Sequence, residues 1–264
     1  MGANTNDIWV ELRAEAANRL AGEPMLASFY HANILNHASL SDALAYVLAE
    51  RLETPVVSAL MLVQVVQSVL QADQQIVQSV ADDLVACRNR DPACSAYIEP
   101  FLHFKGFHAL QTHRIAHGLW QQGRRWLAYL LQGRSSEVFA IDIHPAARLG
   151  SGIMLDHGTG LVIGETAEVG NEVSILHSVT LGGSGCHTGD RHPKVADGVL
   201  ISVGARLIGP IRVGEGAKIG AGSLVLEDVP AHCTVAGVPA RIIGHPAEAH
   251  PSLIMDQGLD TSAD

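Results

Sequence analysis

Aliphatic residues recur at every sixth position through the second half of the chain. The recurrence begins at Ile143, stops after Val179, resumes at Val195 and ends at Ala231. A helix would need a period near 3.6 and an amphipathic strand a period of 2, so neither fits. A six-residue period is typical of a β-helix, in which each repeat forms one flat side of a coil and stacked coils bury the aliphatic residues. We therefore predict a parallel β-helix of hexapeptide repeats over residues 138–244.

The first half of the chain has a different pattern. Apolar residues recur at i, i+3, i+4 and i+7, which is typical of amphipathic helices. The clearest stretches are residues 9–21, 40–52 and 74–88. Pro92 should end the third helix, because proline disfavours helical geometry in the residue before it. The predicted fold class is α+β: an all-helical N-terminal domain (residues 1–137), then the β-helix, then a polar, proline-containing C-terminal tail (residues 245–264).

One segment breaks the six-residue count. The separation of Val179 and Val195 is not a multiple of six, so about ten residues should leave the coil. This excursion loop, residues 182–194, lies within the sequence LGGSGCHTGDRHPKV and carries glycines, two histidines and an Asp-Arg pair. A loop with charged residues and glycines on an otherwise regular coil indicates a functional segment.

Charge and composition exclude several classes of protein. The net charge of −10 argues against nucleic-acid binding, which draws its affinity from cationic surface. The sequence shows no signal peptide and no apolar run of membrane-spanning length, so we expect a cytoplasmic protein without membrane contact. Its four cysteines form no CxxC pair, and free thiols are expected. Any anionic ligand must find local positive charge, and two of the three lysines, Lys194 and Lys218, lie in the repeat region.

Asp142 and His157 are the first candidates for catalysis. Their separation along the chain is close to one coil of three six-residue sides, so they can lie near each other on adjacent coils. A carboxylate beside a histidine fixes its tautomer and raises its basicity, as a general base needs.

Histidine spacing also raises the question of a metal. His187 and His192 are spaced H-x4-H, and His113 and His117 would share one helix face. A zinc site needs further ligands, and the helical pair lacks the Glu of an HExxH motif. We therefore expect no metal.

Longer motifs add a resemblance to a known family. The stretches DIHPAARLGSGIMLDHGTGLVIGETAEVGNEVSILHSVTLGG, GDRHPKV and GAKIGAGSLVLEDVPAHCTVAGVPARIIG resemble the serine acetyltransferases. The resemblance extends back through RDPACSAYIEPFLHFKGFHALQTHRIAHGLW and therefore covers the repeat half and much of the helical half. It implies that the β-helix is left-handed.

The resemblance also implies a reaction. Members of this family move acetyl from acetyl-CoA to the hydroxyl of L-serine, giving O-acetyl-L-serine and CoA in the first step of cysteine biosynthesis. It implies that His157 is the base and Asp142 the carboxylate that orients it. Arg191 and His192 match the residues that bind the serine carboxylate, and Asp91 and Asp156 match those that receive its ammonium group.

Acetyl-CoA, a co-substrate, is implied to lie along the coil edge between subunits. The corresponding residues are Gly183, Gly204, Lys218, Ala221 and Arg241. The resemblance further implies a homo-oligomer, either a trimer or a dimer of trimers (a hexamer), and feedback inhibition by L-cysteine. Many relatives end in an isoleucine that binds O-acetylserine sulfhydrylase. This sequence ends GLDTSAD, so we expect that partnership to be weak or absent.

Three alternatives stay open on the sequence. The chain could be a hexapeptide acyltransferase with another acceptor, such as homoserine, a sugar or an antibiotic; homoserine differs from serine by one methylene and is only weakly excluded. It could be a γ-class carbonic anhydrase, with zinc between subunits of the same coil. It could also be a non-catalytic β-helix scaffold, which would leave Asp142, His157 and Arg191 unexplained.

Overall fold

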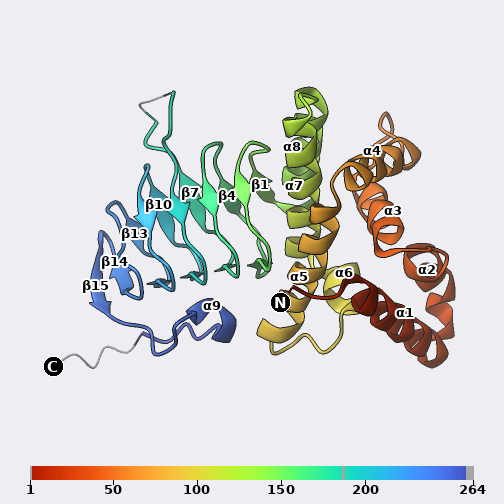
Figure 1. Ribbon diagram of the computed structural model, residues 1–264, viewed down its shortest axis with the longest axis horizontal. Helices are drawn as coiled ribbons and strands as arrows, with labels where there is room; N and C mark the ends of the chain where they lie inside the picture. Colours follow the sequence, from red (N-terminus) through yellow and green to blue (C-terminus); the bar gives the residue numbers. More distant parts are fainter. Residues whose placement is uncertain (1, 186–187, 260–264) are drawn as a thin grey trace.

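The computed structural model describes residues 2–185 and 188–259 and shows two kinds of architecture in sequence order (Figure 1). Helices fill one end of the molecule, and short parallel strands stack into a β-solenoid at the other. The predicted α+β order of a helical region followed by a parallel β-helix is confirmed. No helix among the described residues has the length and apolar character needed to cross a membrane.

The helical region contains short and long helices. They are α1 (Thr5–Gly22), η1 (Pro24–Leu26), α2 (Ala27–Tyr30), the π-helical η2 (His31–Leu35), α3 (Leu40–Leu52), α4 (Ala59–Ala72), α5 (Gln74–Arg90), α6 (Ile98–His103), α7 (Lys105–Gln121) and α8 (Arg125–Phe139). The side chains of Ser39, Ser58 and Asp73 cap the N-termini of α3, α4 and α5 by accepting backbone N–H bonds. As predicted, α5 ends just before the Asp91-Pro92 pair, and Asp91 becomes its C-terminal cap.

Fifteen strands follow among the described residues. They are β1 (Ile141–Ile143), β2 (Arg148–Leu149), β3 (Met154–Leu155), β4 (Leu161–Ile163), β5 (Glu168–Val169), β6 (Ser174–Ile175), β7 (Thr180–Gly182), β8 (Lys194–Val195), β9 (Leu200–Ile201), β10 (Arg206–Ile208), β11 (Arg212–Val213), β12 (Lys218–Ile219), β13 (Leu224–Val225), β14 (Thr234–Gly237) and β15 (Ala240–Gly244). They form three parallel sheets, in the orders β1-β4-β7-β10-β13, β2-β5-β8-β11 and β3-β6-β9-β12-β14. Antiparallel β15 closes the last sheet.

Strand register corrects the length that the sequence predicted for the excursion. A regular coil is three hexads long, as where Val162 pairs with Thr180. The next coil is longer by eight positions, because Thr180 pairs with Arg206, so the excursion adds eight residues where the sequence predicted about ten. Val179 directly precedes β7, which belongs to the first sheet, whereas Val195 pairs with Val169 in the second sheet. The two runs of the six-residue count therefore stop and resume on different sides of the coil.

The six-residue count also departs from the structure at two other places. The first coil is two positions longer than a regular one, since Ile141 pairs with Leu161, and the addition falls in the corner after β3. Ala231, the last position of the count, is exposed and lies outside the core. The inward positions of the coil are otherwise almost all buried aliphatic residues, as the period predicted.

The helical region is fixed to the coil by buried polar contacts. The carboxylate of Asp83 on α5 is fully enclosed and accepts hydrogen bonds from Arg114 on α7 and from the backbone N–H of Ile153. Arg90, at the end of α5, reaches Ser174 and pairs with Glu172. These contacts fix the end of α5, and with it Asp91, against the third sheet. A last helix, α9 (Pro251–Ile254), packs on the same region: Ser174 Oγ donates to the carbonyl oxygen of Ser252 at 2.9 Å.

Candidate active site

A cavity of about 560 Å³ lies where the end of α5 and the start of α7 meet the corner that follows β3. Three of the candidate residues line it. They are Asp91, Asp156 and His157. Asp91 is placed by the end of α5, while Asp156 and His157 follow the last residue of β3. Helical and coil regions thus build this part of the site together.

His157 occupies a tight corner of the coil. Its φ of 56° lies in the left-handed region, and the next residue, Gly158, donates its N–H to the carbonyl oxygen of Asp156 at 2.6 Å. The imidazole is 75% exposed, and its Nε2 lies 3.7 Å from Asp156 Oδ1. A short corner of this kind turns the histidine outward, where a ligand can reach it.

Asp142 lies on β1 and does not contact His157 within one chain. Its carboxylate accepts a 2.7 Å hydrogen bond from the side-chain amide of Gln132 on α8. No hydrogen bond or ion pair joins Asp142 to His157, both of which the structure describes. The spacing argument fails because the separation of the two residues is five positions short of this coil: Asp142 pairs with Val162, and His157 lies at the corner before that strand.

The corner shifts the pKa of Asp156. Burial raises the pKa of its carboxyl group. The Asp91 carboxylate adds to the rise, because two negative charges so close oppose each other, whereas His157 and His177 act in the opposite direction. A cation bound between the two carboxylates would relieve this repulsion.

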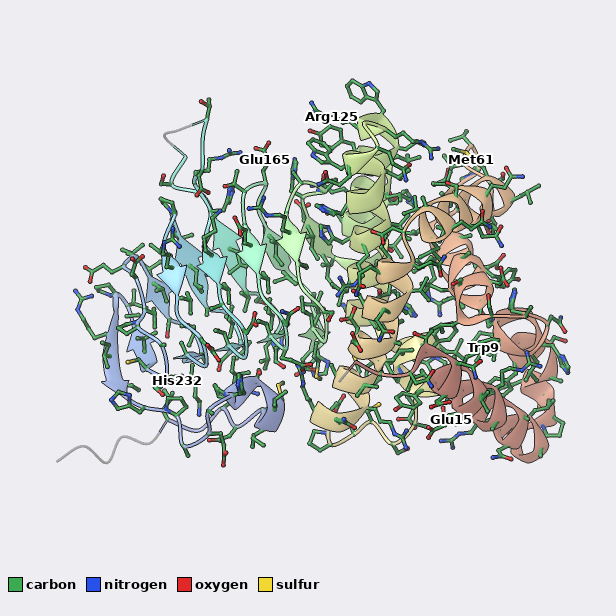
Figure 2. All side chains as sticks on the ribbon, in the orientation of Figure 1. Trp9, Glu15, Met61, Arg125, Glu165 and His232 are labelled. Carbon is green, nitrogen blue, oxygen red and sulfur yellow. The ribbon has the colours of Figure 1, made fainter. Side chains whose placement is uncertain are left out.

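Arg191 and His192 lie at a different corner, at the other end of β4. The Thr166 hydroxyl accepts hydrogen bonds from the backbone N–H groups of both residues, at 3.0 and 3.1 Å, and lies 2.9 Å from His192 Nδ1. Arg191 Nη2 also donates to Glu165 Oε2 at 2.6 Å. Glu165 is labelled in Figure 2, at the edge of the coil from which the excursion leaves.

The second corner is tightly packed. His192 is 7% exposed, and burial, together with the Arg191 guanidinium, lowers the pKa of its imidazole. A Cβ at Gly164 would lie 2.0 Å from His192 Nε2, so only glycine leaves room for the ring. The sequence predicted this pair as a unit, and the structure brings its two members together.

Comparison with known proteins identifies the family. Residues 8–112 match the family model described as serine acetyltransferase, N-terminal. The serine acetyltransferase of Escherichia coli K12 is 55% identical over 250 residues, which cover 95% of this chain and 92% of the relative. This chain belongs to the serine acetyltransferase family.

Solved structures of this family agree along nearly the whole chain. The serine acetyltransferase of Vibrio cholerae superposes with a TM-score of 0.96 at 54% identity and covers 97% of this chain and 100% of its own. A serine acetyltransferase in complex with cysteine has a TM-score of 0.95 at 48% identity, with coverage of 97% and 100%. The Brucella abortus enzyme in complex with coenzyme A has a TM-score of 0.88 at 54% identity, with coverage of 90% and 96%.

Of the five residues that the serine acetyltransferase resemblance assigns to acetyl-CoA, Gly204 and Ala221 lie near one edge of the coil. Strand register aligns four corner residues, each two positions beyond its strand; we call them the corner row. They are His157, His177, Val203 and Ala221. Gly204 follows Val203 in this row with φ of 71°, a conformation that favours glycine, and donates its N–H to the carbonyl oxygen of His177 at 3.0 Å.

The other three residues of that set lie elsewhere. A Cβ at Gly183 would lie 3.2 Å from both Arg191 and His192, so this glycine belongs to the second corner. Lys218 is buried, and its ammonium group contacts Asp256 Oδ2 at 3.2 Å and the carbonyl oxygen of Gly258 at 2.5 Å. Arg241 is exposed on β15 and donates to the carbonyl oxygen of Ala240.

Sequence reasoning missed several residues of this serine acetyltransferase site. His177 stacks edge-to-face on His157 with ring centroids 5.8 Å apart, and Thr166 organises the second corner. Lys105 lines the first cavity and donates to the Thr159 hydroxyl. The register could have shown His177, because it follows His157 by one length of the first coil.

Two further sequence predictions concern a metal site and the partnership with O-acetylserine sulfhydrylase. In the described ranges, no group of three or more His, Cys, Asp or Glu side chains has the arrangement of a metal site, and His113 and His117 do share one face of α7 with rings 5.9 Å apart. His187 of the H-x4-H pair and residues 260–264, on which the sulfhydrylase prediction depends, lie outside the described residues.

Proposed function

We propose that this chain is a serine O-acetyltransferase that moves acetyl from acetyl-CoA to the hydroxyl of L-serine, releasing CoA and O-acetyl-L-serine for cysteine biosynthesis. One observation carries the proposal: an accessible histidine, His157, lies beside two carboxylates, Asp91 and Asp156, in one cavity. An amino-acid acceptor has both the ammonium group that such carboxylates bind and the hydroxyl that such a base deprotonates.

The first corner would hold the amino end of serine. Asp91 and Asp156 repel each other, which contributes to the raised pKa of Asp156, and a bound ammonium would lie between opposite charges instead. His157 Nε2 then accepts the hydroxyl proton as the serine oxygen attacks the thioester carbon. When the carbon–sulfur bond breaks, the departing sulfur takes that proton from the imidazole, and the base is restored.

The second corner would hold the carboxylate, through Arg191 and His192. In one chain the two corners are separated by β4, whose three residues alone span about 10 Å. The ammonium and carboxylate groups of serine are attached to the same carbon, so one serine cannot reach both corners of one chain. We therefore propose that Arg191 and His192 from a neighbouring copy complete each site, in a trimer or a dimer of trimers.

The acetyl donor would lie along the corner row, with Gly204 and Ala221 beside its pantetheine arm. Lys218 already binds the C-terminal segment, so it can reach coenzyme A only if Asp256 and Gly258 release it. L-Cysteine has the same ammonium and carboxylate groups as L-serine, and we propose that it inhibits by binding at the same residues. The proposed role of Asp142 requires that Gln132 release its carboxylate.

The test is thiol release from acetyl-CoA by the purified full-length chain. L-Serine, L-homoserine and no acceptor are compared under otherwise identical conditions. Rapid release with L-serine and only background release without acceptor support the proposal. Release with L-homoserine alone would show that the acceptor is homoserine and not serine. No release with either amino acid would contradict the proposed function.

A further inference from the structure

His144 extends the second corner, where Arg191 and His192 lie, by one coil. It directly follows β1, and its backbone N–H donates to the carbonyl oxygen of Ile163 at 2.9 Å, which aligns it with Gly164 in the next coil. His192 Nε2 lies 2.0 Å from the position that a Cβ at Gly164 would take. Neighbouring strands are about 4.8 Å apart, so the His144 and His192 side chains are neighbours along this corner.

The two nitrogens of the His144 ring have different partners. The backbone N–H of Ala146 donates to Nδ1 at 3.1 Å. A backbone N–H can only donate, so Nδ1 holds the lone pair, and the proton of the neutral ring is on Nε2. Burial lowers the pKa of His144, which favours this neutral form. His144 therefore offers one hydrogen-bond donor, its Nε2–H.

Aromatic side chains hold this ring in place. The rings of Trp120 and Tyr129 meet the His144 ring edge to face, with centroids 5.3 and 5.8 Å away. The described side chains leave Nε2 without a hydrogen-bond partner and do not enclose it. Because the ring is already fixed, little conformational entropy is lost when a ligand accepts a hydrogen bond from Nε2–H.

The carboxylates near His144 already have other partners. Glu165 Oε2 accepts a 2.6 Å hydrogen bond from Arg191, and Asp142 Oδ1 accepts one of 2.7 Å from Gln132. Both carboxylates oppose the lowering of the His144 pKa, but among the described residues no hydrogen bond joins either of them to its ring. The Arg191 guanidinium is also close enough to contribute to that pKa, so one bound anion could contact Arg191 and His144 together.

We propose that His144 is a further acceptor-binding residue, whose Nε2–H donates a hydrogen bond to the carboxylate of L-serine beside Arg191 and His192. This inference rests on the proposed function, and His144 would come from the same copy of the chain as the other two residues. A carboxylate can accept about four hydrogen bonds, so one arginine leaves positions on it free. Arg191 supplies the charge, and neutral His144 adds a donor whose direction is fixed.

A purely structural role is the competing explanation, because Ala146 uses the other nitrogen of the same ring. Asparagine and glutamine separate the two roles. In His144→Asn, the side-chain oxygen can accept the Ala146 N–H, as Asp91 accepts the N–H of Ala93 at 2.8 Å, but the short amide does not reach the position of Nε2. In His144→Gln, the amide N–H can replace Nε2–H, and the corner loses Nδ1.

The experiment measures steady-state thiol release with L-serine at fixed acetyl-CoA. We expect KM for L-serine to rise roughly tenfold in His144→Asn with little change in kcat, and His144→Gln to recover most of that loss. His117→Leu is the matched control, because His117 Nδ1 contacts the Pro145 carbonyl oxygen of the same corner at 2.8 Å, and its KM should stay unchanged. A loss in His144→Gln as large as that in His144→Asn would overturn the inference in favour of a structural role.

A second acceptor tests whether the carboxylate is the group that His144 binds. 2-Aminoethanol has the ammonium and hydroxyl groups of serine but no carboxylate, and it is measured both as an acceptor and as a competitor of L-serine. His144→Asn should weaken L-serine roughly tenfold and leave the affinity for 2-aminoethanol unchanged. Equal weakening of both compounds would show that His144 does not bind the carboxylate.

Failure of this inference is distinct from failure of the proposed function. The unsubstituted chain must first show serine-dependent thiol release, and without it the function itself is wrong. If the unsubstituted chain is active and His144→Asn retains its KM for L-serine, only the role of His144 is wrong. Thermal unfolding of each variant shows whether any loss comes from the fold.

Discussion

The two corners at the ends of β4 differ in how much of their geometry one chain fixes. At the second corner, one hydroxyl, that of Thr166, holds the backbone of Arg191 and His192, and Glu165 directs the guanidinium. At the first corner, His157 is largely exposed, and the carboxylate of Asp156 is 3.7 Å away. The corner proposed to bind the carboxylate is built in advance, whereas the proposed base is left free to meet its substrate.

This difference follows from the chemistry assigned to each corner. A guanidinium that binds a carboxylate gains from a fixed orientation, because both hydrogen bonds depend on its plane. A general base must reach a hydroxyl whose position depends on the bound substrate. Substitutions at the two corners should therefore affect different kinetic constants.

The largest effect is expected at the first corner. His157→Ala removes the proposed base, and kcat with L-serine should fall about 1,000-fold with little change in KM. His232→Ala is a matched control, since His232 is also an exposed corner histidine with positive φ, at 54°. Steady-state thiol release measures both; a His157→Ala variant that keeps a tenth of the activity would contradict the assignment.

The second corner should affect the acceptor instead. Arg191→Leu removes charge-assisted hydrogen bonds worth about 1.5–3 kcal/mol each, so kcat/KM for L-serine should fall roughly 100-fold, mainly through KM. Arg148→Leu is the control, because Arg148 is another coil arginine paired with a glutamate. Saturation curves in L-serine at fixed acetyl-CoA decide the point, and an unchanged KM would show that Arg191 does not bind the acceptor.

Thr166→Val tests whether the Thr166 hydroxyl fixes Arg191 and His192 before serine binds. The variant leaves two backbone N–H groups without their acceptor, at about 1–3 kcal/mol each, and loosens Arg191 and His192. We expect KM for L-serine to rise roughly tenfold. Thr54→Val, which removes a similar hydroxyl acceptor in the helical region, should leave KM unchanged. Equal KM values for the two variants would mean that the corner does not need Thr166.

The sequence predicted the repeating parts of this molecule and missed what depends on exact coil length. The six-residue period, the helices and the stop at Asp91-Pro92 are local patterns, and the structure confirms them. Pairing Asp142 with His157 required their separation to equal one coil, but Asp142 pairs with Val162, and His157 lies five positions earlier, at the corner. Thr166 and His177 were missed because each contacts residues one coil away, which no local pattern records.

The smallest expected effect is a shift along the pH axis at the first corner. The raised pKa of Asp156 means that its carboxylate gains a proton at a higher pH than an ordinary aspartate does. Since only the charged form binds the serine ammonium, serine affinity should fall on acidification, beginning above the usual aspartate range. Asp91→Asn removes one cause of the rise, so the midpoint should move to lower pH even though binding is weaker throughout. Calorimetric titration with L-serine across the acid range, without acetyl-CoA, gives both midpoints independently of the base. A midpoint that does not move in Asp91→Asn would show that the two carboxylates do not share one ammonium site. The proposal that this corner binds an amino-acid acceptor would then rest on His157 alone.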